Sequence, residues 1–273
     1  MPMERILRRL TSLPGARSLW CRFPVGPLKL RVHFGISSRP HYAFGIYSAA
    51  DLAAKLNIPV ISVIEFGVAG GRGLLAMEHI AAEVSRTLGV GIEVYGFDIG
   101  SGMPTPLDFR DLPHVWDKGF YAMDQGALEA LLKQAKLIVG DVAKTVPEFA
   151  RTHLTAPVGF VAFDLDYYSS TKAALQIFDG GPESHLPRVF CYFDDVIWPE
   201  SACHNEYMGE LCALREFNEE HARMKVTPIH MFAYTRPHPA AWNEQTYVLH
   251  DYQHPLYCVN LTPKEERYTQ LPI

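Results

Sequence analysis

Between residues 47 and 222, short apolar runs alternate with segments whose apolar residues recur at helical spacing. The apolar runs are rich in Val, Ile and Phe and end in Gly or Asp, which is typical of strands buried on both faces. Such strands, alternating with helices, predict a parallel sheet covered by helices on both sides. The runs that predict strands are 59–67, 92–98, 136–141, 158–166 and 188–195. The segments that predict helices are 47–58, 74–88, 128–135, 170–178 and 209–222.

The two ends of the chain complete the predicted architecture. Residues 225–236 and 244–252 follow the last helix closely and predict a terminal β-hairpin. No repeat or Gly/Ser linker interrupts the chain. We expect an α/β fold with a single doubly wound, Rossmann-like sheet of five parallel βα units and a C-terminal hairpin. This domain spans residues 58–273, and residues 1–57 form an N-terminal helical extension that caps its crevice.

Charge and composition exclude several classes of partner. The net charge of −5 and the lack of clustered Lys and Arg argue against nucleic acid or an anionic membrane. Five cysteines without CxxC spacing favour reduced thiols and a soluble, cytoplasmic protein. No apolar run reaches the roughly 18 residues that a membrane-spanning helix needs. The twelve histidines show no HxxH or HExxH spacing, so zinc is not expected.

The segment IEFGVAGGRG contains two overlapping nucleotide-binding patterns. Glu65-x-Gly67-x-x-x-Gly71 is the turn of methyltransferases that use S-adenosylmethionine, whereas Gly71-x-Gly73-x-x-Ala76 satisfies the dinucleotide fingerprint. In a dinucleotide fold the first glycine of the triplet follows the strand directly. Here Gly67 follows the strand, and Glu65 suits a ligand with an ammonium group better than one with a pyrophosphate. We therefore expect the turn, including Val68 and Ala69, to bind S-adenosylmethionine.

Acidic residues end the second and third predicted strands. A carboxylate at the position of Asp98 can accept both ribose hydroxyls, which either candidate cofactor carries. Asp141 can contact the adenine side of the cofactor, and a turn-forming role for it is about as consistent with the sequence.

Four carboxylates follow the fourth and fifth predicted strands. Asp164 and Asp166 point the same way if their strand persists, and Asp194 and Asp195 end the adjacent strand. Carboxylates that converge without a nearby Lys or Arg repel one another, and a hard divalent cation such as Mg²⁺ removes that cost. Separate turn residues that never converge are the alternative. The sequence favours a Mg²⁺ site.

Together, the IEFGVAGG turn, GFDIGSGMP, GDVAKTVP, DLDYYSSTKAAL and FDDV resemble the macrocin-type O-methyltransferases. These are metal-dependent class I methyltransferases that act on sugar hydroxyls of natural products. The resemblance implies Asp164, Asp194 and Asp195 as Mg²⁺ ligands and Asp166 as the general base. It also implies that Glu65, Gly67, Gly71 and Asp98 contact S-adenosylmethionine.

The acceptor is expected to be a small molecule, either a sugar or a phenolic compound, and a homo-oligomer remains open. Residues 103–126 contain three prolines and several aromatic residues, which predict a covering loop. Candidate pocket walls are Trp116, Tyr121, Trp198, His204 and Tyr207. His33 and His204 are possible alternative bases. Two competing hypotheses are an NAD(P)-dependent oxidoreductase and a non-catalytic binding protein with the same fold.

Overall fold

A seven-stranded sheet forms the centre of the computed structural model, which describes residues 2–262. The strand order is β3-β2-β1-β4-β5-β7-β6. The strands are β1 (Val60–Phe66), β2 (Gly91–Asp98), β3 (Lys136–Val139), β4 (Val158–Phe163), β5 (His185–Phe193), β6 (Met224–Pro228) and β7 (Thr246–Asp251). The first five are parallel, and β7 pairs antiparallel with both β5 and β6. The predicted parallel sheet with a terminal hairpin is confirmed.

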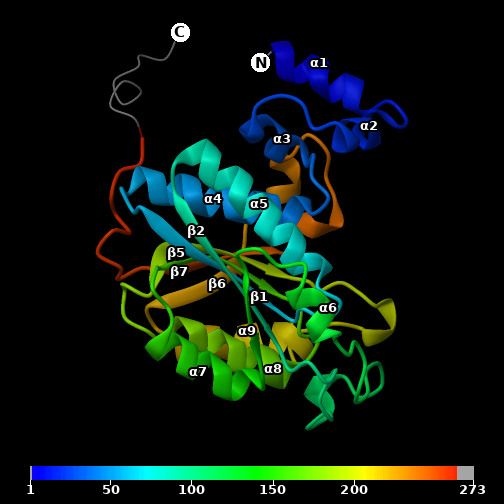
Figure 1. Cartoon of the computed structure of the whole chain (residues 1–273), viewed down its shortest axis with the longest axis vertical. Helices are drawn as coiled ribbons and strands as arrows, with labels where there is room; N and C mark the ends of the chain where they lie inside the picture. Colours follow the sequence, from blue (N-terminus) through cyan, green and yellow to red (C-terminus); the bar gives the residue numbers. More distant parts are fainter. Residues whose placement is uncertain (1, 263–273) are drawn as a thin grey trace.

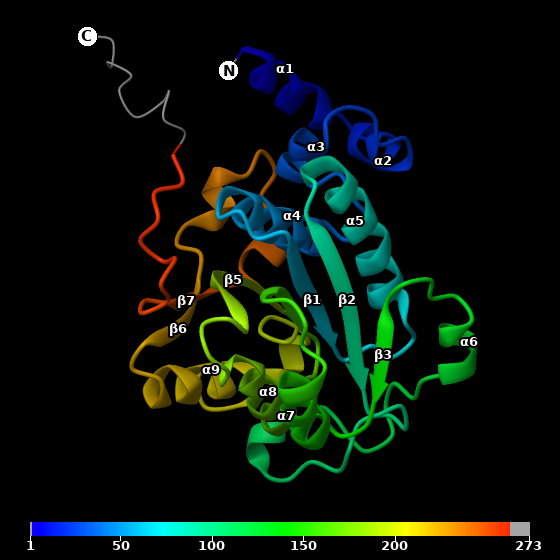
Figure 2. The ribbon, with the colours of Figure 1, turned by 60° about the vertical axis from the view of Figure 1, so that its left-hand side comes forward.

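Helices cover both faces of this sheet (Figures 1 and 2). One face carries α4 (Pro40–Lys55) and α5 (Arg72–Leu88). The other carries α7 (Val142–Thr152), α8 (Tyr168–Ala174) and α9 (Gly209–Glu220). The short helix α6 (Gln125–Glu129) lies beside the β3 edge, and α1 (Pro2–Thr11), α2 (Ala16–Arg22) and α3 (Leu28–Phe34) lie above α4 and α5.

Alternate residues of each central strand enter two separate apolar layers. In β1, Ile61 and Val63 pack in the layer under α4 and α5, whereas Ile64 and Phe66 pack under the opposite helices. This is the two-residue period of a strand that is buried on both faces. All four side chains are fully buried. The apolar runs of the sequence thus reflect two cores, one on each side of the sheet.

Several predicted boundaries differ from those observed. The helix expected at 47–58 begins at Pro40, because proline suits the first turn of a helix, and α4 packs on β4, β5 and α5. The helix expected at 128–135 is α6, which ends at Glu129. The strand expected at 225–236 ends at Pro228, which has no N–H to continue the ladder. The domain boundary between residues 57 and 58 stays a prediction. Helix α4 belongs to the predicted N-terminal extension, residues 1–57, and it packs within the helical layers of the fold.

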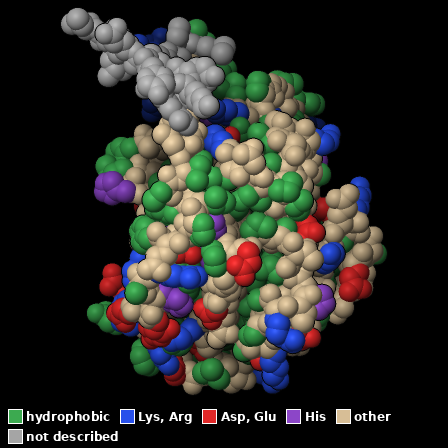
Figure 3. Space-filling view, turned by 90° about the vertical axis from the view of Figure 1, so that its left-hand side faces the viewer, with side chains coloured by type: hydrophobic (Ala, Val, Ile, Leu, Met, Phe, Trp, Pro, Cys, Tyr) green, Lys and Arg blue, Asp and Glu red, His purple; other side chains and the backbone are tan. Residues whose placement is uncertain are grey.

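Acidic and basic side chains lie interspersed over the lower half of the face in Figure 3. Within residues 2–262, none of the helices combines the length and the apolar character that crossing a membrane requires.

Candidate functional site

A cavity of about 870 Å³ opens at the carboxyl ends of β1, β2, β4 and β5. The chain leaves β1 toward β2 on one side, whereas β4 lies on its other side, so the connecting loops diverge at this point. Such switch points hold the ligands of doubly wound sheets. The candidate residues that line the cavity are Glu65, Gly67, Val68, Ala69, Asp98, Asp141, Asp164, Asp166, Asp194 and Asp195. Gly71 is absent from the lining and forms the N-cap of α5.

Glu65 presents a buried carboxylate to the cavity. The residue is 1% exposed, and its Oε1 accepts a hydrogen bond of 2.5 Å from the Tyr42 hydroxyl. Its Oε2 is buried without a hydrogen-bond partner among the described residues. Burial raises the pKa of Glu65 to about 8, and the Tyr42 hydrogen bond opposes that rise. A Cβ on Gly73 would stand 1.8 Å from Glu65 Oε1, so the glycine leaves room for this carboxylate.

The glycine turn after β1 is held by Asp98 from the neighbouring strand. Asp98 Oδ2 accepts hydrogen bonds from the backbone N–H of Val68 and Ala69, at 2.9 and 2.8 Å. Its Oδ1 accepts another from Gly100, at 2.6 Å. Gly67 adopts φ 86°, and a Cβ there would overlap the carbonyl oxygen of Asp164. Asp98 therefore orders the turn, and its role toward ribose stays a prediction.

Asp141 caps α7. Its side chain accepts a hydrogen bond from the N–H of Ala143 at 3.0 Å, which satisfies one of the free donors at the start of the helix. The turn chemistry considered for this residue is present, and Asp141 also lines the cavity.

Three carboxylates converge at one end of the cavity. One oxygen each of Asp164, Asp194 and Asp195 lies within 4.8 Å of the other two. Burial and the neighbouring acids raise the pKa of Asp164 and of Asp195 well above the usual range. The Tyr192 hydroxyl donates to Asp194 Oδ1 at 2.6 Å, and the backbone N–H of Asp195 donates to Glu210 at 3.2 Å. The first contact orients the Asp194 carboxylate, and the second holds the backbone at Asp195.

Asp166 differs from the sequence expectation in how it reaches the cluster. The strand ends at Phe163, and Asp166 has a left-handed backbone conformation with φ 58°, so it does not share a strand face with Asp164. Its backbone N–H donates to Asp195 Oδ2 at 2.9 Å. Burial, followed by the nearby carboxylates, raises the pKa of Asp166 to about 7. The turn, rather than strand alternation, brings Asp166 to its neighbours.

No lysine or arginine among the described residues forms an ion pair with the three converging carboxylates. Two cationic side chains line the cavity elsewhere, Arg39 and Arg72. Across residues 2–262, the cluster therefore combines converging carboxyl groups with no protein cation at ion-pair distance, which is the arrangement expected of a divalent cation site.

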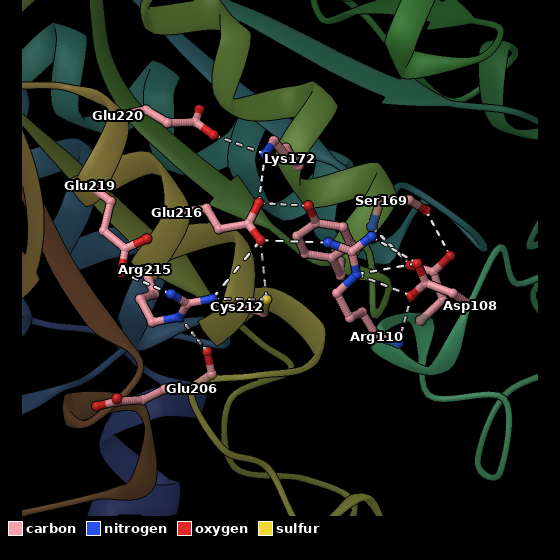
Figure 4. Close-up of polar contacts among 12 residues, drawn as sticks. Asp108, Arg110, Ser169, Lys172, Glu206, Cys212, Arg215, Glu216, Glu219 and Glu220 are labelled. Carbon is pink, nitrogen blue, oxygen red and sulfur yellow. Dashed lines mark hydrogen bonds and ion pairs between the residues drawn. The ribbon is translucent and has the colours of Figure 1, made fainter.

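The segment 103–126 covers the cavity, as its composition predicted, and is tied to α8 and α9. Buried Asp111 accepts hydrogen bonds from the N–H and hydroxyl of Ser169 and from the N–H of Leu107, all between 2.8 and 2.9 Å. Arg110 pairs with Asp108 and reaches Glu216 of α9, which also accepts from Lys172 at 2.5 Å (Figure 4). These contacts fix the base of the loop.

The predicted pocket walls divide into two groups. Trp116, Tyr121 and Trp198 line the cavity. His204 and Tyr207 are outside its lining, and so is His33, whose ring pairs with Glu4 at 3.1 Å. The structure therefore gives neither histidine a place at the cavity wall.

Four functional positions were missed in the sequence: Tyr42, Tyr192, Glu210 and Arg39. Tyr42 and Tyr192 donate to the carboxylates of Glu65 and Asp194, and Glu210 accepts from the backbone N–H of Asp195. Tyr192 is two residues from its partner, whereas Tyr42 and Glu210 are 15 or more positions from theirs. A tyrosine two residues before a strand-end aspartate was a readable signal. The others depend on how α4 and α9 pack, which no local pattern reveals.

The sequence matches no model of a known protein family and no curated protein. Solved structures do share its fold. The calicheamicin methyltransferase CalS11 is 22% identical over 90% of this chain and 90% of its own, with a TM-score of 0.51. The O-methyltransferase NovP is 14% identical over 82% of this chain and 88% of its own, with a TM-score of 0.50. The chain thus has the Rossmann-like fold that these O-methyltransferases share.

Proposed function

We propose that this protein is an S-adenosylmethionine-dependent, Mg²⁺-assisted O-methyltransferase that acts on a hydroxyl or diol of a small molecule. The observation that carries the proposal is the content of one cavity. A buried glutamate with an unpartnered oxygen lies in it together with three converging carboxylates. The fold shared with CalS11 and NovP supports the same reaction class, and the name of CalS11 supports a natural-product acceptor.

The donor side rests on Glu65 and the turn after it. An unpaired oxygen of a buried carboxylate is costly, and the ammonium group of S-adenosylmethionine would satisfy it. The cofactor supplies a methyl group on a sulfonium, which an oxygen nucleophile displaces in line. Val68 and Ala69 shape the turn, and we assign the ribose hydroxyls to Asp98, which lines the same cavity. A pyrophosphate carries no ammonium group that could satisfy the unpartnered oxygen of Glu65.

The metal side rests on Asp164, Asp194 and Asp195. Their oxygens fit a hard cation in charge, in donor type and in mutual distance. Mg²⁺ held there would supply positive charge that lowers the pKa of an acceptor hydroxyl. Because burial raises the pKa of Asp164 and Asp195, binding of the cation would release protons from this cluster.

We assign to Asp166 the role of general base that receives the proton of the acceptor. Its pKa of about 7 is well matched to a general base at neutral pH, and its carboxyl group faces the same cavity. The N–H contact with Asp195 fixes its position beside the cluster. Trp116, Tyr121 and Trp198 would exclude water and bound the acceptor, whether sugar or phenol.

Calorimetric titration tests the donor assignment directly. We expect the protein to bind S-adenosylhomocysteine at micromolar concentration and NADH at least 100-fold more weakly. Tighter binding of NADH would favour the oxidoreductase hypothesis. An assay of methyl transfer to a panel of sugars and catechols then distinguishes an enzyme from a binding protein. The assay measures the S-adenosylhomocysteine that is formed. Full turnover in excess EDTA would remove the metal from the proposal.

A further inference from the structure

Arg39 is a cation in an otherwise acid-rich cavity. Its side chain forms no ion pair or hydrogen bond within the described residues, although its guanidinium lies over the Tyr42 ring, 5.4 Å from the centroid. The residue is only half-buried, yet it lines the cavity. A guanidinium without an ion pair at a cavity wall is a ready partner for an anionic ligand group, preferably a carboxylate or phosphate.

The position of Arg39 relative to Glu65 narrows the choice of ligand. Tyr42 connects the two, because its ring faces the Arg39 guanidinium and its hydroxyl donates to Glu65 Oε1 at 2.5 Å. The other oxygen of Glu65 is buried and unpartnered. Among the described residues, the cavity therefore presents an unpaired cation and an unpaired carboxylate oxygen that are connected through one tyrosine. A ligand end that carries both an ammonium and a carboxylate would satisfy both.

The backbone holds Arg39 in place for this role. It is the residue before α4, and Pro40 starts the helix directly after it. Its N–H donates to the Ser37 hydroxyl at 3.3 Å, and α4 is packed on β4 and β5. The guanidinium thus extends from a fixed helix start rather than from a free loop.

We infer that Arg39 binds the carboxylate of the amino-acid end of the methyl donor, while Glu65 binds its ammonium group. The inference rests on the proposed function and assigns a residue of the N-terminal segment to cofactor recognition. A clamp of this kind selects ligands with a zwitterionic amino-acid end over other adenosine compounds. It also gives residues 1–57 a part in binding, because α4 positions both Arg39 and Tyr42.

Affinities for three ligands test the assignment: S-adenosylhomocysteine, its analogue without the carboxylate, and its analogue without the amine. We expect Arg39→Gln to weaken binding of S-adenosylhomocysteine about 10- to 100-fold and to leave binding of the carboxylate-free analogue unchanged. Glu65→Gln should show the complementary pattern, with its loss confined to ligands that carry the amine. Arg39→Lys should keep much of the preference for S-adenosylhomocysteine over its analogue without the carboxylate. Melting temperatures of the ligand-free variants distinguish a folding defect from a binding defect.

Arg72, the other cation on the cavity wall, is the matched comparison. We expect Arg72→Gln to leave unchanged the preference for S-adenosylhomocysteine over its analogue without the carboxylate. If that preference is lost in Arg72→Gln but kept in Arg39→Gln, the assignment of Arg39 is overturned. Equal losses for both ligands in Arg39→Gln would overturn it too. Failure of the wild-type protein to bind S-adenosylhomocysteine at all would instead refute the proposed function, and the clamp with it.

Discussion

The Glu65→Gln substitution should stabilise the ligand-free protein relative to the wild type, by an amount that increases with pH. Burial raises the pKa of Glu65 from 4.5 to about 8 in the folded protein. Between these values the folded state holds a proton that the unfolded state has lost, so the free energy of unfolding falls as the pH rises. Below about pH 4.5 the glutamate is protonated in both states and contributes no such penalty.

The size of the effect follows from that difference in pKa. Each pH unit between 4.5 and about 8 costs about 1.4 kcal/mol, so the penalty is about 2 kcal/mol at pH 6 and about 4 kcal/mol at pH 8. The amide that Glu65→Gln introduces carries no charge and avoids this penalty at every pH. Other acids of the cavity, such as Asp166, titrate in the same range, but they are present in both proteins. The difference between the proteins therefore isolates Glu65.

Urea unfolding of both ligand-free proteins at pH 5, 6, 7 and 8 measures this difference. We expect the stability of the variant relative to the wild type to increase steadily over the series. Saturation with S-adenosylhomocysteine should shrink the trend, because the proposed contact with its ammonium group would stabilise the ionised glutamate of the wild type. A difference that stays constant with pH would refute the reasoning, since Glu65 would then have an ordinary pKa or be solvated.

Three further predictions concern the turn, the base and the covering loop. Gly73→Ala should reduce binding of S-adenosylhomocysteine at least 10-fold in calorimetry, because a Cβ would lie 1.8 Å from the buried glutamate of β1. Gly126→Ala in α6, outside the cavity lining and with its nearest atom 4.0 Å away, should bind normally. Asp166→Asn should lower kcat about 100-fold or more with little change in cofactor affinity, and an unchanged kcat in steady-state assays would exclude it as the base. Asp111→Ala should lower the free energy of unfolding by about 3 kcal/mol, since three hydrogen bonds are lost, and Asp108→Ala at an exposed ion pair should cost less than about 1 kcal/mol in the same urea titration.

The parallel sheet could be predicted from the apolar character of its strands. The runs around Ile64 and Val161 are apolar at nearly every position, which requires helices on both faces and therefore parallel neighbours. The meeting of Asp164 with Asp194 and Asp195 followed from the same logic, because β4 and β5 are adjacent and end at the same edge. Position at a strand end was sufficient to place these groups.

The details that orient those groups could not be predicted in this way. The left-handed turn at Asp166 and the hydrogen bonds of Asp98 to the glycine turn depend on backbone geometry within a few residues of each strand end. The contact of Tyr42 with Glu65 depends on α4 lying on the sheet, and the sequence placed the start of that helix seven residues too late. Long-range packing, which periodicity does not encode, decides such partners.

A titration of the protein with Mg²⁺, in the presence of S-adenosylhomocysteine, tests the central claim most directly. The account predicts one site whose affinity rises with pH, because protons must leave the converging carboxylates before the cation binds. Asp194→Asn should abolish binding at this site, whereas Asp141→Asn, in the same cavity but outside the cluster, should retain it. Binding that is undetectable at millimolar Mg²⁺, or that is equal in Asp194→Asn and the wild type, would contradict the account.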